Sequence, residues 1–423
     1  MKAGRMSMPS FALAAVGVAW PVVVAGDGNM GSKEVVEPLE EPKSRSICEW
    51  IEDSPGLLYE SDDNPYIQSW EIGGRFQYQA AYLAGKDVNG RHFHDTYDEF
   101  RRVRLDTELQ FLRFLKAELS VNLVDDRRFR DSYPFDLSWG YDTIDQLTME
   151  IDFDEAFDLK FLDKLEFTYG KMKVAVGEEA HQSSREIITI ERSAIIDRIG
   201  GEEGRPTGGM LSLGRGDWEL SLGVFSGDAN TEYLGSWNDG QFYYASLEWE
   251  PTKRWRFVFD QIMNDPDGID LALGYAWASS LAGVYTGDRW GILVNGVYGD
   301  NGGVQEGHVR QRRQGDFWGC VVMPWYWLLE DKLQFVVSYE YQASEELEGI
   351  RLDSRYVRAR HQDVLVDVGR GRGDLSHKIY AGLNYYICGH RSKIMGGVSH
   401  TELRARRGDV SAMSYLIAYR GYF

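Results

Sequence analysis

Short runs in which apolar and polar side chains alternate fill this sequence from Trp70 to the last residue, Phe423. In WEIGGRFQYQAAYL, one face carries Ile72, Phe76, Tyr78, Ala80 and Tyr82, and the other carries Glu71, Arg75, Gln77 and Gln79. In FRRVRLDTELQF, the apolar positions are Val103, Leu105, Thr107, Leu109 and Phe111, and the polar positions are Arg102, Arg104, Asp106, Glu108 and Gln110. A period of two residues predicts β-strands. The second face is charged in run after run, which favours strands between lipid and water over those of a soluble sandwich.

About sixteen such runs follow one another along the chain. Their predicted spans are 70–83, 99–111, 115–124, 145–159, 164–174, 207–213, 218–226, 241–250, 255–263, 270–279, 289–299, 315–328, 332–342, 376–387, 392–402 and 411–423. Short connections, such as 112–114 and 251–254, alternate with long ones, such as 84–98 and 175–206. In an outer-membrane barrel one rim carries tight turns and the other carries long loops. The sequence therefore predicts an all-β fold, a transmembrane antiparallel β-barrel of about 16 strands.

The last run, MSYLIAYRGYF, explains how such a barrel would close. Its aromatic and apolar parity includes Tyr415, Ile417 and Tyr419, so it reads as a strand up to the chain end. Lipid tolerates no open sheet edge, so we expect this strand to pair with the first one. We also expect the odd-numbered residues of 103–111, 333–341 and 379–387 to face lipid. Several aromatic residues, such as Trp249 and Trp255 around the turn PTKR, stand at strand ends, where a barrel carries its interfacial girdle.

The N-terminal part has a different pattern. Residues 1–25 open with Lys2 and Arg5, continue with an uncharged and mostly apolar run, and end in small residues, which predicts a signal peptide. Residues 26–69 are polar, acidic and aperiodic, so we predict an irregular leader with a short helix near Cys48, followed by a barrel domain at 70–423. The three cysteines are scattered and form no CxxC motif, so we expect neither a disulfide framework nor a zinc site.

Composition and motifs exclude several functions. The net charge is −20, and no basic domain points to nucleic acid. Neither GxSxG nor HExxH occurs, and no cofactor is expected. His92 and His94 lie in a predicted loop without an obvious third ligand, which favours a solvated loop over a metal site. Two alternatives to a channel are a barrel enzyme such as an outer-membrane lipase, and a secreted β-rich adhesin or glycan-binding protein, which would be soluble without detergent.

One segment, from Leu165 to Ile195, contains Gly-Lys-x-Lys, a glutamate-rich approach, Ser-Ser-Arg and Glu-Arg-Ser. The positions are Gly170, Lys171, Lys173, Glu178, Ser183, Ser184, Arg185, Glu191, Arg192 and Ser193. This segment resembles the signature of a known family, the phosphate-selective porins. The resemblance implies a sixteen-stranded, homotrimeric, water-filled pore in the outer membrane of a Gram-negative-type bacterium, with a long third loop folded into the lumen. It also implies outer-membrane lipid and small anions such as phosphate, or other small solutes, as partners.

The candidate site residues follow from the resemblance and from strand parity together. We expect the loop at 175–206 to fold inward and the pore constriction to carry Lys171, Lys173, Arg185 and Arg192. The polar parity of the first strands adds the pore-lining residues Arg75, Arg102, Arg104 and Lys116. For Arg185 and Arg192 a second role stays open, because they could pair with Glu178, Glu179, Glu186 or Glu191 and only pin the loop. Acidic residues share the predicted lumen face, so the total charge leaves the sign of ion selectivity open.

Overall fold

The computed structural model describes residues 46–52, 56–124, 139–159, 161–200, 205–228, 233–237, 240–265, 273–302, 315–352, 355–358, 361 and 363–423. The predicted signal peptide, 1–25, and most of the predicted leader lie outside these residues. Among the described residues, no helix is long and apolar enough to cross a membrane.

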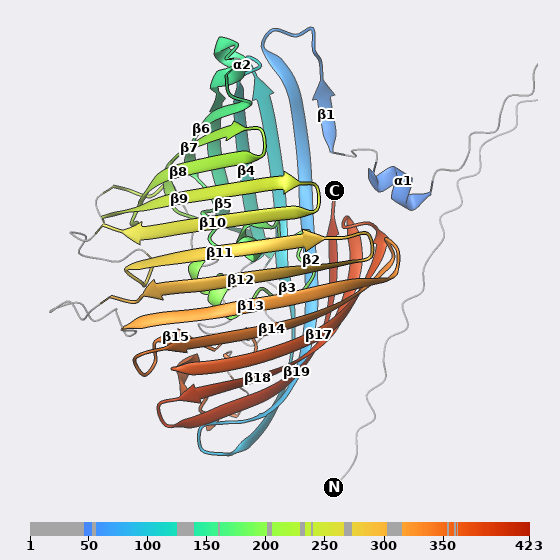
Figure 1. Cartoon of the computed structure of the whole chain (residues 1–423). Helices are drawn as coiled ribbons and strands as arrows, with labels where there is room; N and C mark the ends of the chain where they lie inside the picture. Colours follow the sequence, from blue (N-terminus) through green and yellow to red (C-terminus); the bar gives the residue numbers. More distant parts are fainter. Residues whose placement is uncertain are drawn as a thin grey trace, which may run out of the picture. The chain divides into compact units, whose positions relative to one another are not determined.

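Sixteen strands form one closed antiparallel barrel (Figure 1), as predicted. They are β2 (Ile67–Lys86), β3 (His92–Phe111), β4 (Leu115–Val124), β5 (Trp139–Asp152), β6 (Lys164–Lys171), β7 (Thr207–Arg215), β8 (Trp218–Ser226), β9 (Gln241–Thr252), β10 (Trp255–Asn264), β11 (Trp277–Thr286), β12 (Trp290–Asp300), β13 (Asp316–Leu329), β14 (Leu333–Ser344), β17 (Leu375–Cys388), β18 (Ser392–Ala405) and β19 (Gly408–Tyr422). The remaining elements are α1 (Ile47–Glu52), β1 (Leu57–Glu60), α2 (Phe153–Phe157), α3 (Glu178–His181), α4 (Ala194–Ile199), β15 (Ile350–Arg351), η1 (Gly369–Gly371) and β16 (Arg372–Gly373).

The C-terminal strand closes the barrel. β19 pairs with β2 from Ser411 opposite Lys86 to Tyr422 opposite Arg75. The backbone of Phe423 then donates to and accepts from Gly74, at 3.1 and 3.2 Å. The Phe423 ring lies so close to Gly74 that a Cβ atom there would come within 2.5 Å of it. Residues 411–423 therefore seal the seam of the barrel.

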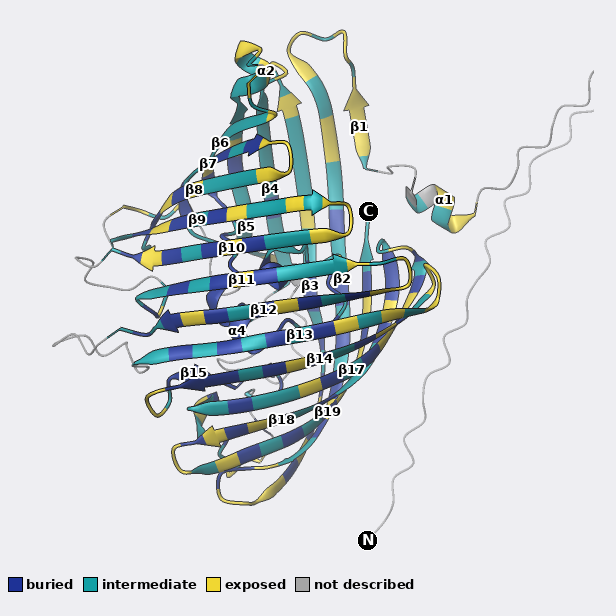
Figure 2. Cartoon of the chain, in the orientation of Figure 1, coloured by how far each residue is buried: buried dark blue, intermediate teal, exposed yellow. Residues whose placement is uncertain are grey.

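Outward and inward residues alternate along the strands (Figure 2). Leu105, Phe335 and Leu383 are 38–45% exposed on the outside, while their neighbours Gln334 and Asn384 are buried toward the lumen. As predicted, the odd-numbered residues of 103–111, 333–341 and 379–387 point to the outside of the barrel. An apolar outer face of this kind matches lipid, and a polar inner face matches water.

Several predicted strand ends were wrong. The connection expected at 84–98 is a short turn, because β2 extends to Lys86 and β3 begins at His92. His92 and His94 are therefore on a strand and not in a loop. The run expected at 145–159 is β5 followed by α2, and the one expected at 270–279 is β11, seven residues later in the chain. Pairing with neighbouring strands determines where these strands end. The hydrophobic pattern of a single strand carries no information about this pairing.

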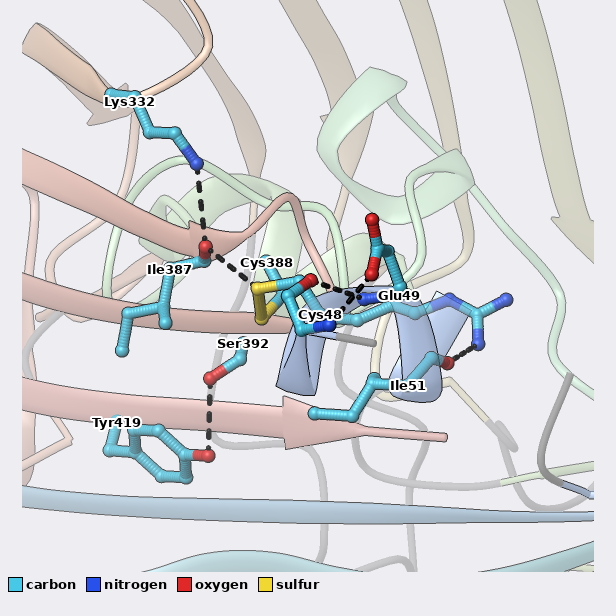
Figure 3. The surroundings of a disulfide bond; sticks show 10 residues. Cys48, Glu49, Ile51, Lys332, Ile387, Cys388, Ser392 and Tyr419 are labelled. Atoms are coloured by element: carbon cyan, nitrogen blue, oxygen red, sulfur yellow. Dashed lines mark hydrogen bonds between the residues drawn. A yellow bond between two sulfur atoms is a disulfide. The ribbon is translucent and has the colours of Figure 1, made fainter. Parts of the chain in front are cut away.

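The absence of a disulfide was also a wrong expectation. Cys48 of α1 is bonded to Cys388 at the end of β17, across a sequence separation of 340 residues (Figure 3). Cys320 keeps a free thiol. The predicted short helix near Cys48 is present as α1, but the supposedly irregular stretch after it contains β1 and the start of β2. Spacing alone could not pair two cysteines that only the closed barrel brings together.

Candidate functional site: the lumen of the barrel

The segment between β6 and β7 folds into the lumen and carries α3 and α4. Its backbone N–H groups donate to side chains of the barrel wall: Gly177 to Asp260 of β10 at 2.7 Å, and Ile195 to Glu340 of β14 at 3.0 Å. From β19, the Arg420 side chain donates to the Ser184 carbonyl at 3.1 Å. Residues of α4 are almost all buried. We call residues 172–200 the inserted segment.

A buried histidine strengthens one attachment of the inserted segment. His181, at the end of α3, lies 2.9 Å from the Asp260 carboxylate and 3.2 Å from the Glu248 carboxylate. Burial by itself lowers the pKa of His181, but the hydrogen bonds and charges of the two carboxylates outweigh it and raise the pKa to about 9. The imidazole is therefore protonated at neutral pH and holds α3 against β9 and β10 as an ion pair.

A basic band lies on the wall that faces the inserted segment. In the β2–β3 ladder Arg75 is opposite Arg104, and Gln77 is opposite Arg102. The register shifts between Gln77 and Tyr78, and both Arg101 and Arg102 are buried on the inner side. A β-bulge inserts one unpaired residue and re-aims the side chains next to it. The bulge therefore places Arg101 on the inner face, whereas strict alternation would have placed it on the outer face.

An acidic band lies four residues farther along the same strands. Glu71 is opposite Glu108 in the β2–β3 ladder, and Glu108 is opposite Glu118 in the β3–β4 ladder. Asp106 stands between the acidic band and the basic band. At about 3.3 Å per residue the two bands are separated by roughly 13 Å along the strand, with Asp106 halfway between them. An ion that travels along this wall meets both signs of charge within a short distance.

Between the wall and the inserted segment lies a cavity of about 870 Å³. Its lining includes ten arginines and lysines and seven aspartates and glutamates, whereas the whole chain has 46 basic and 66 acidic residues. The basic members are Arg75, Arg101, Arg102, Arg104, Lys171, Lys173, Arg185, Arg192, Arg205 and Arg391. Among the described residues, the charge balance of the cavity lining is thus opposite in sign to that of the chain.

The four residues expected at the constriction all line this cavity. Lys171 is the last residue of β6, and Lys173 donates to the carbonyls of Ala180 and Gln182. Arg192 donates to the Glu179 and Gln182 carbonyls, at 2.6 and 3.0 Å. These contacts place Lys173 and Arg192 in the internal scaffold of the inserted segment as well as beside the lumen.

Arg185 connects the inserted segment to the wall. Its guanidinium lies 2.7 Å from the Asp106 carboxylate of β3 and 5.0 Å from the ring centroid of Tyr422. Arg185 is therefore paired with a wall residue, Asp106, and not with one of the loop glutamates that the sequence suggested. Both side chains of the pair remain partly exposed, at 28% and 16%, toward the lumen.

Of the four expected pore-lining residues, three line the cavity. Arg75 donates to the Ser184 hydroxyl at 2.6 Å, Arg102 donates to Gln77 at 3.0 Å, and Arg104 lies 2.7 Å from the Asp145 carboxylate. Lys116 is outside the cavity lining and pairs with Glu108 at 3.0 Å.

Arg101 and Arg205 are lining residues that we did not single out from the sequence. Arg205 shares the Asp145 carboxylate with Arg104, at 3.2 Å. The only hint of the bulge in the sequence is the pair of adjacent arginines, Arg101 and Arg102, in FRRVR, which interrupts the alternation of polar and apolar residues. Arg205 lies in the connection at 175–206, where no alternation of apolar and polar residues indicates which side chains face the lumen. Among the described residues, no group of three His, Cys, Asp or Glu side chains could hold a metal ion.

Comparisons with known proteins agree with this architecture. Residues 71–255 match the model of a family described as phosphate-selective porin O and P. The search of curated proteins found no match. Among solved structures, the chain is similar to a loop-L8 deletion mutant of OmpT, an outer membrane protein of Vibrio cholerae, with a TM-score of 0.52 and 11% identity over 84% of this chain and 99% of that one.

Two further structures show the same fold. The outer membrane channel DcaP of Acinetobacter baumannii gives a TM-score of 0.51 with 12% identity, over 86% of this chain and 99% of that one. OmpF of Salmonella typhi, in complex with daunomycin, gives a TM-score of 0.50 with 12% identity, over the same shares of the two chains. At such low identity the similarity concerns the fold.

Proposed function

We propose that this porin conducts small anions, phosphate among them, more readily than small cations. The observation that carries the proposal is the basic band of Arg75, Arg102 and Arg104, which faces the inserted segment across a cavity with an excess of basic residues. Protein walls have a lower dielectric constant than water, so fixed charges act strongly on an ion confined between them. Rings of arginine and lysine are the usual means by which a pore favours anions.

The proposed constriction consists of Lys171, Lys173, Arg185 and Arg192. Arg185 has the most direct position, because it is partly exposed in the lumen and belongs to the inserted segment. Lys173 and Arg192 contribute charge while they hold backbone carbonyls of the same segment. Lys116 contributes at the edge of the lumen, where Glu108 offsets its charge.

The apolar outer face supports a position in the outer membrane of a Gram-negative-type bacterium, reached with residues 1–25 as the export signal. We propose a homotrimer surrounded by outer-membrane lipid, and one similar structure, of OmpT, is described as a trimer form. A secreted adhesin would need a polar exterior, whereas residues such as Leu105 and Leu383 are exposed on the outside of the barrel. The function proposed here is passive diffusion, without a catalytic step, a cofactor or bound nucleic acid.

A second candidate is a pore that favours cations, and the acidic band of Glu71, Glu108 and Glu118 supports it. This band lines the same cavity. The net excess of basic side chains and the position of Arg185 favour the anion pore. Both candidates share the same barrel and the same lumen.

Chloride current through the purified protein in planar bilayers tests the phosphate part of the proposal. Phosphate added at neutral pH should reduce the chloride current in a saturable manner, because a divalent anion dwells longer at the basic band. A zwitterionic solute of similar size, such as glycine, is the control and should leave the current unchanged. Equal and small effects of both solutes would contradict preferential phosphate entry.

A further inference from the structure

We propose that α1 and β1, fastened by the disulfide between Cys48 and Cys388, form a fixed part of the periplasmic mouth of the pore. The lining of the lumen cavity includes Gly56 and Leu57, together with Tyr422 and Phe423 of the C-terminus. Figure 1 shows α1, β1 and the C-terminus at the same end of the barrel as the short turns β9–β10, β11–β12 and β13–β14. In an outer-membrane barrel the short turns face the periplasm.

β1 continues the barrel wall where β19 stops. The β19–β2 ladder ends with Tyr422 opposite Arg75, and the β1–β2 ladder begins with Leu57 opposite Glu71. β1 and β19 therefore occupy consecutive stretches of the same edge of β2. Without β1 this edge would present unpaired backbone groups to the mouth, which is a hazard for a β-protein.

The contact between β1 and β2 depends on a glycine. The N–H of Ile72 donates to the Gly56 carbonyl at 2.8 Å. A Cβ atom on Gly56 would lie 1.7 Å from the Ile72 carbonyl oxygen, so another residue could not hold this position without moving the backbone. Close backbone approach of this kind is a general reason for glycine at a strand end.

The disulfide anchors the other end of this segment. Cys388 ends β17 and is buried, and Arg391 in the same turn donates to the Ile51 carbonyl of α1 (Figure 3). β18 and β19 lie between β17 and β2 in the sheet. The segment is thus attached at β17 through the disulfide and at β2 through β1, on either side of β18 and β19. The attachment at β17 is covalent.

Non-covalent contacts alone hold this segment weakly. All four residues of β1 are exposed, and Ile47 of α1 is 71% exposed. The ladder of β1 with β2 has three register pairs, whereas that of β19 with β2 has twelve. The barrel is therefore closed without α1 and β1. The disulfide accordingly positions the mouth, and an exported protein meets the oxidising conditions that keep such a bond intact.

Single-channel conductance of the full-length protein tests the proposal. Dithiothreitol transfers two electrons and two protons, so that Cys48 and Cys388 become thiols and the reagent becomes a cyclic disulfide. We expect reduction, and separately the double substitution Cys48→Ser with Cys388→Ser, to release the segment and widen the mouth. The conductance should then rise by roughly 1.2- to 2-fold only, because the mouth and the constriction are resistances in series and the constriction is unchanged. Cys320→Ser is the control and should behave like the wild-type protein before and after reduction.

Proteolysis shows independently whether the segment is released. Glutamyl endopeptidase should cut after Glu60 of β1 roughly tenfold faster once the disulfide is removed, because local opening governs cleavage. Faster cleavage with unchanged conductance would overturn the assignment of this segment to the mouth. Unchanged cleavage would overturn the anchoring role of the disulfide. A raised conductance of Cys320→Ser before reduction, or the loss of its response to reduction, would also overturn the proposal.

A pair of neighbouring leucines tests the lining role without touching the disulfide. Leu57 lines the cavity and Leu58 does not. Leu57→Trp should lower the conductance by roughly 1.2-fold or more, since a larger side chain narrows the mouth, and Leu58→Trp should leave it unchanged. Equal effects of the two substitutions would contradict the proposed geometry. Heat-modifiable migration on gels establishes that each variant contains a folded barrel.

Discussion

Replacing Arg185 by alanine should lower the anion-to-cation permeability ratio of the pore. The Arg185 guanidinium lies in the lumen, 2.7 Å from the Asp106 carboxylate on the wall. The substitution removes one positive charge and leaves the carboxylate without this partner. The passing ion therefore meets a site that is more negative by one unit.

The size of the effect follows from Coulomb's law. An ion that passes about 7 Å from the lost charge changes its energy by about 0.6 kcal/mol in a water-like medium and by about 0.3 kcal/mol after screening at 0.1 M salt. The change disfavours anions and favours cations by the same amount. The two effects combine in the permeability ratio, which should fall about threefold.

Reversal potentials in a salt gradient across planar bilayers measure this ratio. Asp106→Asn should raise it about threefold, and the double variant should return it close to the wild-type value, since both charges are then gone. Arg254→Ala is a matched control, because Arg254 forms an exposed ion pair with Asp288 at 3.0 Å outside the cavity lining. An unchanged ratio in Arg185→Ala, with a larger or noisier conductance, would show that Arg185 only anchors the inserted segment.

Three further predictions concern the barrel and the inserted segment. Deleting Phe423 should reduce the yield of heat-modifiable barrel at least about twofold, because the seam loses two backbone hydrogen bonds to Gly74, whereas Phe423→Tyr should assemble normally. The stabilising contribution of protonated His181 is fully present below about pH 6.5, the usual histidine pKa, and is lost above a pH of about 9. Current noise of the wild-type protein should therefore increase between these two pH values, whereas His181→Ala should be noisy at every pH. Spin labels at position 105 should be quenched by lipid-soluble reagents and labels at position 104 by aqueous ones, and the reverse pattern would contradict the orientation of β3.

The barrel and its two faces could be predicted because their signal is local. Alternation with a period of two is contained in each strand, as in the odd-numbered apolar residues 103–111. The segment at β11 was misplaced because small residues such as Ala278, Ser280 and Ala282 on its inner face give little contrast between the two parities. There, pairing with β10 and β12 decides the boundaries.

The details of the site depend on contacts that the sequence does not contain. The parity of β2 and β3 placed Arg75, Arg102 and Arg104 toward the lumen, but only the bulge between the strands adds Arg101. The inward course of 175–206 came from a family resemblance and not from periodicity. The pairing of Arg185 with Asp106 and of Cys48 with Cys388 joins residues 79 and 340 positions apart, which only the closed barrel brings together.

The reversal potential of the unmodified protein in a potassium chloride gradient tests the proposed anion preference. We expect a potential whose sign shows that chloride is more permeant than potassium, because basic side chains outnumber acidic ones along the lumen cavity. Removing charge from the basic band, as in Arg104→Gln, should move that potential toward zero. A wild-type potential of the opposite sign would show that the acidic band of Glu71, Glu108 and Glu118 controls permeation, and it would contradict the proposed anion preference.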